Sequence, residues 1–97
     1  MGGAIKGLGF GGETWRDVTS LRSNGVTYTN NLGYPILISV QATSASDGPC
    51  VRINGILRAQ QYVGGYAGTY SNVTTIVPPG STYSSSCGNL VFWHELY

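Results

Sequence analysis

The chain has 97 residues, which is enough for one domain with one hydrophobic core. Only 9% of the residues are charged and the net charge is +1, so neither the basic surface of a nucleic-acid-binding protein nor a polybasic membrane patch is present. No apolar run approaches the roughly 20 residues of a membrane span, and we expect no membrane insertion.

The chain begins with a glycine-rich segment, residues 1–12, that holds six glycines and one charged residue in MGGAIKGLGFGG. We expect it to be a linker or an entry segment from a longer protein, with the domain itself spanning residues 13–97. The letters GLGFGG match the GxGxxG pattern of dinucleotide-binding proteins. The strand before it and the helix after it that this motif requires are absent, so no cofactor is expected.

Short runs rich in β-branched and aromatic residues follow, separated by turn signals. The residues around Trp15 and Tyr28 are typical of strands. In YPILISVQA, residues 34–42, Ile36, Ile38 and Val40 share one face of an extended chain, which predicts a strand with a buried side.

The segment VRINGIL predicts a β-hairpin, because Asn54-Gly55 fits a two-residue turn whose central residues take positive φ. With strict two-residue pairing, one face of the hairpin carries Val51, Ile53, Ile56 and Arg58. The other face carries Arg52, Leu57 and Ala59. Neither face is purely polar.

The run VTTIV ends at Pro78-Pro79-Gly80, where Pro79 and Gly80 suit the central positions of a type II turn. Tyr83 lies in a further strand-like run, and LVFWHELY ends the chain as an alternating strand. Trp15 and Trp93 are expected in the core or in an interface. Regularly spaced strands without a capped amphipathic helix predict an all-β fold, a small antiparallel β-sandwich.

The stretch QYVGGYAGTY, residues 61–70, places Tyr62, Tyr66 and Tyr70 four residues apart. Its glycines disfavour a helix, since each costs roughly 1 kcal/mol relative to alanine. In an extended chain the three rings would point to the same side. They would then form either a row on the surface or partial packing beneath a loop.

Rings among small polar residues are typical of adaptable recognition surfaces, because the ring supplies contact area and the hydroxyl supplies direction. The C–H face of a saccharide can lie on such a ring. Gln60, Gln61 and Asn72 can bond saccharide hydroxyls. The sequence therefore predicts a receptor-binding surface made of these three residues together with Tyr62, Tyr66 and Tyr70.

Residues for catalysis or metal binding are few. His94 is the single histidine, so a metal site would need its copies from three chains around a threefold axis. No GxSxG nucleophile motif occurs, and none of the acidic residues lies near another in sequence: Glu13, Asp17, Asp47 and Glu95. We therefore expect no catalytic residue and no bound metal.

The two cysteines, Cys50 and Cys87, lie far apart in sequence and lack the Cys-x-x-Cys spacing of metal and redox sites. Two buried free thiols are the expectation, with a disulfide between them as the open alternative.

Several segments together resemble the C-terminal head domain of bacteriophage tail fibres and tail proteins, and R-type pyocin fibres end in similar modules. These segments are GETWRDVTSLRSNGVTYTNNLGYPILISV, VRINGIL, IVPPGSTYS and GNLVFWHEL. The resemblance covers roughly residues 11–97, and IVPPGSTYS and W-x-E-L are its most specific parts. It implies a small β-sandwich at the distal end of a long homotrimeric fibre, in contact with lipopolysaccharide or another envelope glycan.

The shared motifs imply a structural role only. They include Trp15, Asp17, Thr27, Tyr28, Pro35, Gly55, Pro78, Pro79, Gly80, Tyr83, Trp93 and Glu95. Residues 43–49 and 60–72 match the family poorly, and loops of such fibres decide which receptor is bound, so the resemblance also points to the tyrosine stretch. Some fibre tips hold iron through a His-x-His pair, which is absent here.

The expected function is that of a tail-fibre receptor-binding tip, located on the virion, that adheres to a bacterial surface glycan without catalysis. Its expected partners are that glycan, further copies of itself in a homotrimer, and the upstream fibre shaft. The alternatives are a structural cap that trimerises the fibre and a small depolymerase-like hydrolase. The sequence names neither the host nor the sugar.

Overall fold

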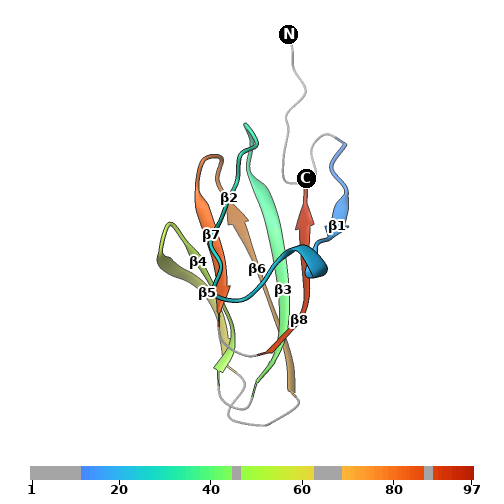
Figure 1. Cartoon of the computed structure of the whole chain (residues 1–97), viewed down its shortest axis with the longest axis vertical. Coiled ribbons are helices and arrows are strands. Elements are labelled where there is room, and N and C mark those ends of the chain that lie inside the picture. The colour runs from blue at the N-terminus through green and yellow to red at the C-terminus, as the bar shows by residue number, and fades with distance from the viewer. Residues whose placement is uncertain (1–11, 45–46, 63–68, 87–88) are drawn as a thin grey trace.

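The computed structural model describes residues 12–44, 47–62, 69–86 and 89–97, and Figure 1 gives the order of its elements. These are β1 (Trp15–Asp17), the short 3-10 helix η1 (Thr19–Leu21), β2 (Tyr28–Thr29), β3 (Ile36–Ser44), β4 (Asp47–Ile53), β5 (Ile56–Tyr62), β6 (Thr69–Val77), β7 (Thr82–Ser86) and β8 (Asn89–Leu96). The strand that was expected at each of Trp15, Tyr28 and Tyr83 is confirmed.

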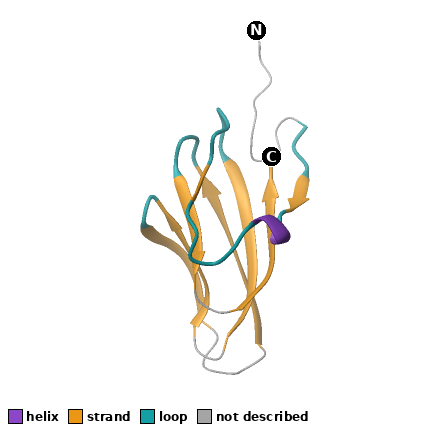
Figure 2. Ribbon diagram, in the orientation of Figure 1, coloured by secondary structure: helices purple, strands orange, loops and turns teal. Residues whose placement is uncertain are grey.

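The strands form two four-stranded sheets, in the orders β1-β8-β3-β6 and β2-β7-β4-β5. Figure 2 draws the strands in orange. All strand pairs are antiparallel. Side chains from both sheets meet in one core, so the all-β, sandwich-like architecture expected from the sequence is confirmed.

The core is built from alternate residues of each strand. In β3 the side chains of Ile36, Ile38 and Val40 are buried against the second sheet, as the period-two pattern predicted. Trp93 of β8 lies opposite Val40 and is fully buried, so its expected core position is confirmed. Trp15 is 49% exposed and does not belong to the core.

Both predicted turns are confirmed. Asn54 and Gly55 have φ values of 53° and 80°, the left-handed values that a two-residue hairpin turn requires. Gly80 has a φ of 78°, and the Ser81 N–H donates to the Pro78 carbonyl at 3.2 Å, which closes the type II turn.

The predicted pairing of the hairpin is wrong beyond its first pairs. A register shift between Val51 and Arg52 places Val51 opposite Ala59. Ala59 packs against the core, whereas Arg58 is exposed. The cause is a β-bulge, which adds a residue on one strand and moves the following residues to the other face.

The expectation of free thiols is also wrong for Cys50, which is buried and disulfide-bonded. Cys50 lies opposite Ser86 across the β4–β7 pair. Cys87 is the other cysteine of the chain and lies outside the described residues.

The sandwich has two distinct ends (Figure 1). At one end, which we call the terminal end, Thr14 and Tyr97 exchange two backbone hydrogen bonds of 3.1 and 3.3 Å. The opposite end, which we call the distal end, is bordered by strand residues Ser44, Asp47, Tyr62, Thr69, Ser86 and Asn89. The described residues within segments 43–49 and 60–72 thus border the distal end.

Candidate functional site

The tyrosine stretch is divided between the two sheets. Tyr62 is the last residue of β5, and Tyr70 is the second residue of β6 in the other sheet. Tyr66 lies outside the described residues, as does the side chain of Tyr62. The prediction of one extended row is therefore wrong for Tyr62 and Tyr70, because β5 and β6 are edge strands of different sheets.

Tyr70 is a surface residue at the distal end. Its side chain is 65% exposed, and it lies opposite Thr43 of β3. Val40 and Val73 form a buried pair of the same two strands, so by alternation Thr43 and Tyr70 lie on the outer face of the sheet. The phenol ring is therefore free to meet a partner molecule.

Asn72 and Gln41 form an amide pair next to Tyr70 on this outer face. They lie opposite each other in β6 and β3, and the Gln41 Nε2 group donates to the Asn72 Oδ1 atom at 2.7 Å. This bond leaves the Gln41 oxygen and the Asn72 nitrogen with capacity for hydroxyl groups. Gln60 is exposed on β5, opposite Cys50, and the side chain of Gln61 lies outside the described residues.

The same face continues into β8 with two stacked rings. Phe92 lies opposite Gln41, and its ring stacks on that of His94 with centroids 4.4 Å apart at an angle of 13°. The His94 Nε2 atom is 3.8 Å from the Asp17 Oδ1 atom. The sequence reasoning missed Phe92, although alternation with buried Trp93 and Glu95 in LVFWHELY would have placed it outward.

Asp17 holds the turn from β1 into η1. Its Oδ1 atom accepts hydrogen bonds from the Thr19 N–H at 3.0 Å and from the Thr19 hydroxyl at 2.6 Å. These bonds, the hydroxyl bond first, lower the pKa of Asp17. The backbone N–H of Trp93 donates to the same Thr19 hydroxyl at 2.9 Å, so the turn is attached to β8.

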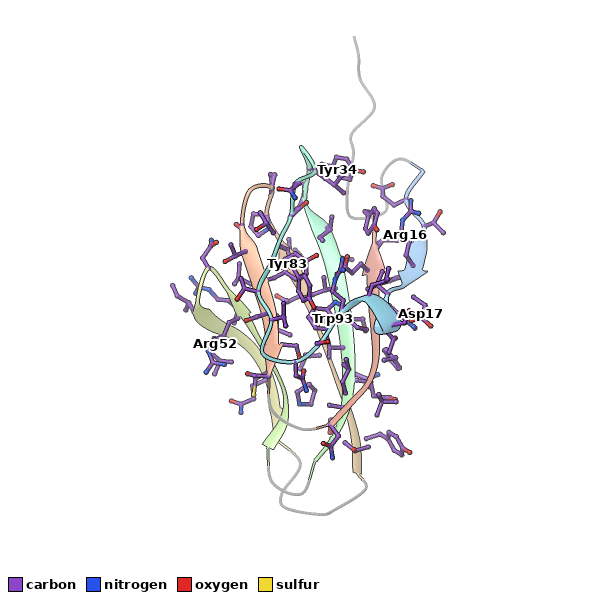
Figure 3. All side chains as sticks on the ribbon, in the orientation of Figure 1. Arg16, Asp17, Tyr34, Arg52, Tyr83 and Trp93 are labelled. Carbon is purple, nitrogen blue, oxygen red and sulfur yellow. The ribbon has the colours of Figure 1, made fainter. Side chains whose placement is uncertain are left out.

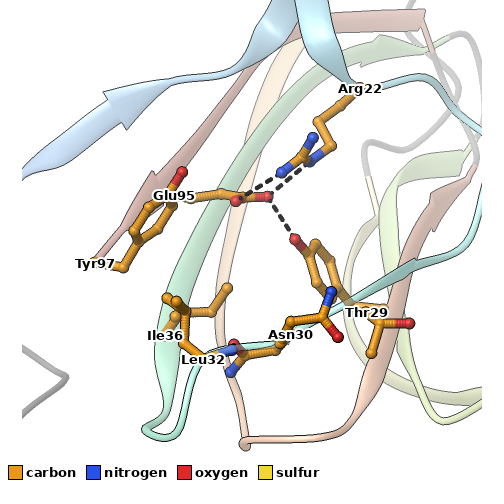
Figure 4. Close-up of a pocket in the computed structure, with 9 residues that line it drawn as sticks. Arg22, Thr29, Asn30, Leu32, Ile36, Glu95 and Tyr97 are labelled. Atoms are coloured by element: carbon orange, nitrogen blue, oxygen red, sulfur yellow. Dashed lines mark hydrogen bonds and ion pairs between the residues drawn. The ribbon is translucent and has the colours of Figure 1, made fainter.

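Glu95 lies in a buried network between the sheets, drawn in Figure 4. Arg22 contacts both of its carboxylate oxygens, and Oε2 also accepts from the Tyr83 hydroxyl and the Trp93 indole N–H, each at 3.1 Å. Figure 3 shows Tyr83 and Trp93 in the interior of the ribbon and Arg16 and Asp17 at its periphery.

The network changes the acidity of its members. Burial, followed by the charge of Glu95, raises the pKa of Tyr83 to about 12. Burial disfavours the charge of Arg22, but the hydrogen bond to Glu95 and its charge outweigh this effect and raise the pKa of Arg22. These interactions thus hold the Glu95 carboxylate in place as a structural part of the interior.

The other two acidic residues of the chain are Glu13 and Asp47. Glu13 is half-buried, and the side chain of Asp47 lies outside the described residues. Within the described ranges, no three His, Cys, Asp or Glu side chains gather closely enough to hold a metal ion. In the same ranges, no helix has the length and apolar character needed to cross a membrane.

Comparisons of this chain with protein-family models, with curated proteins and with solved structures found no match.

Proposed function

We propose that this chain is the receptor-binding domain at the tip of a bacteriophage tail fibre, and that it adheres to a bacterial surface glycan without catalysis. The observation that carries the proposal is the position of Tyr70. An aromatic side chain that is 65% exposed lies at the distal end, beside the amide groups of Gln41 and Asn72.

The chemistry of these groups suits a saccharide. The C–H face of a sugar ring packs on an aromatic face, and the spare amide oxygen and nitrogen accept from and donate to ring hydroxyls. The stacked Phe92 and His94 rings extend the same outer face beyond Gln41. Tyr62, Tyr66, Gln60 and Gln61 belong to the proposal on sequence grounds.

The polarity of the fold supports this assignment. Thr14, near the start of the described residues, pairs with Tyr97 at the terminal end, so a fibre shaft that precedes it would attach there. The distal end would then point away from the shaft and toward the bacterium. On the virion, three copies per tip and several fibres per particle would turn weak contacts into tight adhesion, with gains of about 10²–10⁴ over a single site.

A second candidate, a trimerising cap, is favoured by an apolar row across the outer face of the same sheet. Trp15, Leu96, Leu37 and Ile76 lie opposite one another on successive strands. The two ends of this row, Trp15 and Ile76, are 49% and 48% exposed. Large apolar side chains that are about half exposed are suited to contact between copies of the chain.

The experiment that tests adhesion uses the whole chain and lipopolysaccharide or capsule purified from several bacterial strains and immobilised on a biosensor surface. The proposal predicts binding to the polysaccharide of some strains, competition by the same soluble polysaccharide, and no release of reducing ends. Absence of binding to every polysaccharide by a protein that is trimeric in solution would favour the cap. Release of reducing ends would favour a hydrolase.

A further inference from the structure

A groove lies at the open edge of the sandwich, between β5 at the end of one sheet and β6 at the end of the other. It has a volume of about 410 Å³, and its lining includes Ile56, Arg58, Thr75, Ile76 and Pro78. Ile56 is 52% exposed and Ile76 is 48% exposed, so the aliphatic surface of the groove is open to a partner. Grooves of this size take large apolar groups.

Arg58 gives the groove one positive charge. Its side chain is exposed, and none of the described side chains forms an ion pair with it. A partner that covers the groove removes the guanidinium from water, and this removal is costly unless the partner supplies a counter-charge. The groove therefore fits a partner that presents an acidic group next to a large apolar group.

The opposite edge of the same protein carries these two groups. Trp15 and Asp17 lie two residues apart on β1, the edge strand at the other end of the sheet that contains β6. Alternation places both side chains on one face, and Trp15 is 49% exposed while the side chain of Asp17 is 69% exposed. The Asp17 contacts described above are made by Oδ1, so Oδ2 retains capacity to accept from a guanidinium.

Asp17 is also the fitting acid by elimination among the acidic residues whose side chains the structure describes. Glu95 is buried and holds Arg22, and Glu13 is half-buried. Of these three, Asp17 alone is exposed. A second copy of the chain that offers a counter-charge to Arg58 would therefore offer Asp17.

The groups on β1 and those in the groove have the same order and spacing. From the terminal end toward the distal end, Trp15 precedes Asp17 by two residues on β1, and Ile56 precedes Arg58 by two residues on β5. Trp15 is also level with Ile76, because both belong to the apolar row. A rotation about an axis parallel to the strands keeps every residue at its level, so it brings the β1 edge of one copy to the groove of the next with both pairs matched.

We propose that the groove binds the β1 edge of a second copy of this chain. The Trp15 ring packs on Ile56 and Ile76, and the Asp17 carboxylate accepts from the Arg58 guanidinium. The β1 edge and the groove lie on opposite sides of the sandwich, so two copies in contact leave one edge and one groove open. Such a heterologous contact closes as a ring of three or more copies.

The proposal rests on the second candidate function, the trimerising cap, and it specifies the contact between copies. It does not depend on adhesion at the distal end.

The test is the molar mass of the whole chain in solution, measured by sedimentation equilibrium over a wide range of concentrations. We expect a mass of at least three copies. Trp15→Ala and Arg58→Asp should each weaken the association by roughly 30-fold or more, as is typical when a central aromatic group or one partner of a covered charge pair is removed. Arg52→Asp is the matched control, since it reverses the charge of another exposed arginine outside the groove and should retain the mass of the wild type.

A charge exchange identifies the partner of Arg58. Asp17→Arg should dissociate the assembly, and the double variant Asp17→Arg with Arg58→Asp should restore it, because the ion pair forms again with its charges reversed. Asp17→Arg also removes the hydrogen bonds from Thr19. Asp17→Asn keeps an oxygen acceptor for Thr19, and it should weaken the association while it retains the melting temperature of the wild type.

Three outcomes would count against the proposal, and they are distinguishable. A wild type that is monomeric at every concentration would overturn this contact together with the cap, and it would leave adhesion intact. An assembly that persists in both Trp15→Ala and Arg58→Asp would overturn this contact alone, because the copies would then meet through another surface. Full association of Asp17→Asn, or a folded double variant that stays monomeric, would overturn the pairing of Asp17 with Arg58.

Discussion

Arg22 and Glu95 form a bidentate ion pair, with Nε 3.0 Å from Oε2 and Nη2 3.1 Å from Oε1. Arg22 belongs to the segment between η1 and β2, and Glu95 belongs to β8, 73 residues further along the chain. The guanidinium also lies 4.6 Å from the centroid of the Tyr28 ring. The pair therefore holds the long segment before β2 against the core.

Loss of either partner should destabilise the fold strongly. Glu95→Ala leaves the Arg22 cation without its counter-charge, and Arg22→Ala leaves a buried carboxylate uncompensated, so each should lower the free energy of unfolding by about 3–5 kcal/mol. Arg16→Ala is the matched control, since its exposed guanidinium contacts the Tyr97 ring and carbonyl and should contribute about 0.5–1 kcal/mol. Urea unfolding measures the free energy of unfolding of all three variants. Equal losses of this free energy for Glu95→Ala and Arg16→Ala would contradict the stabilising role of the Arg22–Glu95 pair.

Stability should fall at alkaline pH because of Tyr83. An unfolded tyrosine loses its proton near pH 10. The buried hydroxyl in the folded protein keeps its proton until about pH 12. Between these values the unfolded state binds fewer protons, so the free energy of unfolding decreases as pH rises, whereas below about pH 10 the contribution is fully present.

The matched variant for this pH effect is Tyr83→Phe, which lacks the hydroxyl and its bond to Glu95. At neutral pH the wild type should be more stable by about 1.5–3 kcal/mol, the usual value of a hydrogen bond to a charged group. The difference should narrow in unfolding experiments as pH rises above about 10. A constant difference up to strongly alkaline pH would show that Tyr83 does not titrate in this way.

The hairpin turn provides a test of backbone conformation. Gly55 has a φ of 80° and open space around its Cα, so the cost of Gly55→Ala comes from the left-handed backbone alone. We expect a loss of about 1–2 kcal/mol. Gly33→Ala is the control, since Gly33 also has open space but no positive φ, and it should change stability by less than about 0.5 kcal/mol. Similar thermal shifts for both variants would refute the assignment.

The parts of the fold that were predicted correctly depend on short-range sequence. Asn54-Gly55 and Pro79-Gly80 specify their turns through the φ values that these residues favour, and the alternation around Ile38 specifies which side of β3 is buried. Long-range features were missed. The bulge after Val51 has no local signature, and it moved Arg58 and Ala59 to the faces opposite to those predicted.

The candidate site was predicted only in part for the same reason. Tyr70 and Asn72 were identified from composition, and both are exposed. Period-two reasoning could not show that Tyr62 and Tyr70 belong to different sheets, because the sheet of a strand depends on its partners rather than on its own residues. The Gln41–Asn72 pair likewise joins residues 31 apart.

The disulfide of Cys50 should contribute to stability. A disulfide restricts the unfolded chain and typically adds about 2–4 kcal/mol. Chromatographically purified protein should show no free thiol when it is denatured without reductant, and the melting temperature should fall after reduction. Cys50→Ser should melt at the lower temperature with or without reductant. A free-thiol titre of two per chain before reduction would contradict the disulfide.

The adhesion proposal is tested most directly by the binding of fluorescently labelled protein to a panel of bacterial strains, with Tyr70→Ala beside the wild type. The control is Leu21→Ala, because Leu21 and Tyr70 are similarly exposed, at 67% and 65%, but Leu21 lies in η1. All three proteins should melt at the same temperature, since neither side chain is part of the core. The triple alanine variant of Tyr62, Tyr66 and Tyr70 extends the test to the whole stretch.

The account predicts that the wild type and Leu21→Ala bind the strains selectively. Tyr70→Ala should bind about tenfold more weakly, which corresponds to a loss of about 1.4 kcal/mol at one contact. The triple variant should not bind. Full binding by the triple variant would contradict the account, because it would place the receptor site elsewhere on the molecule.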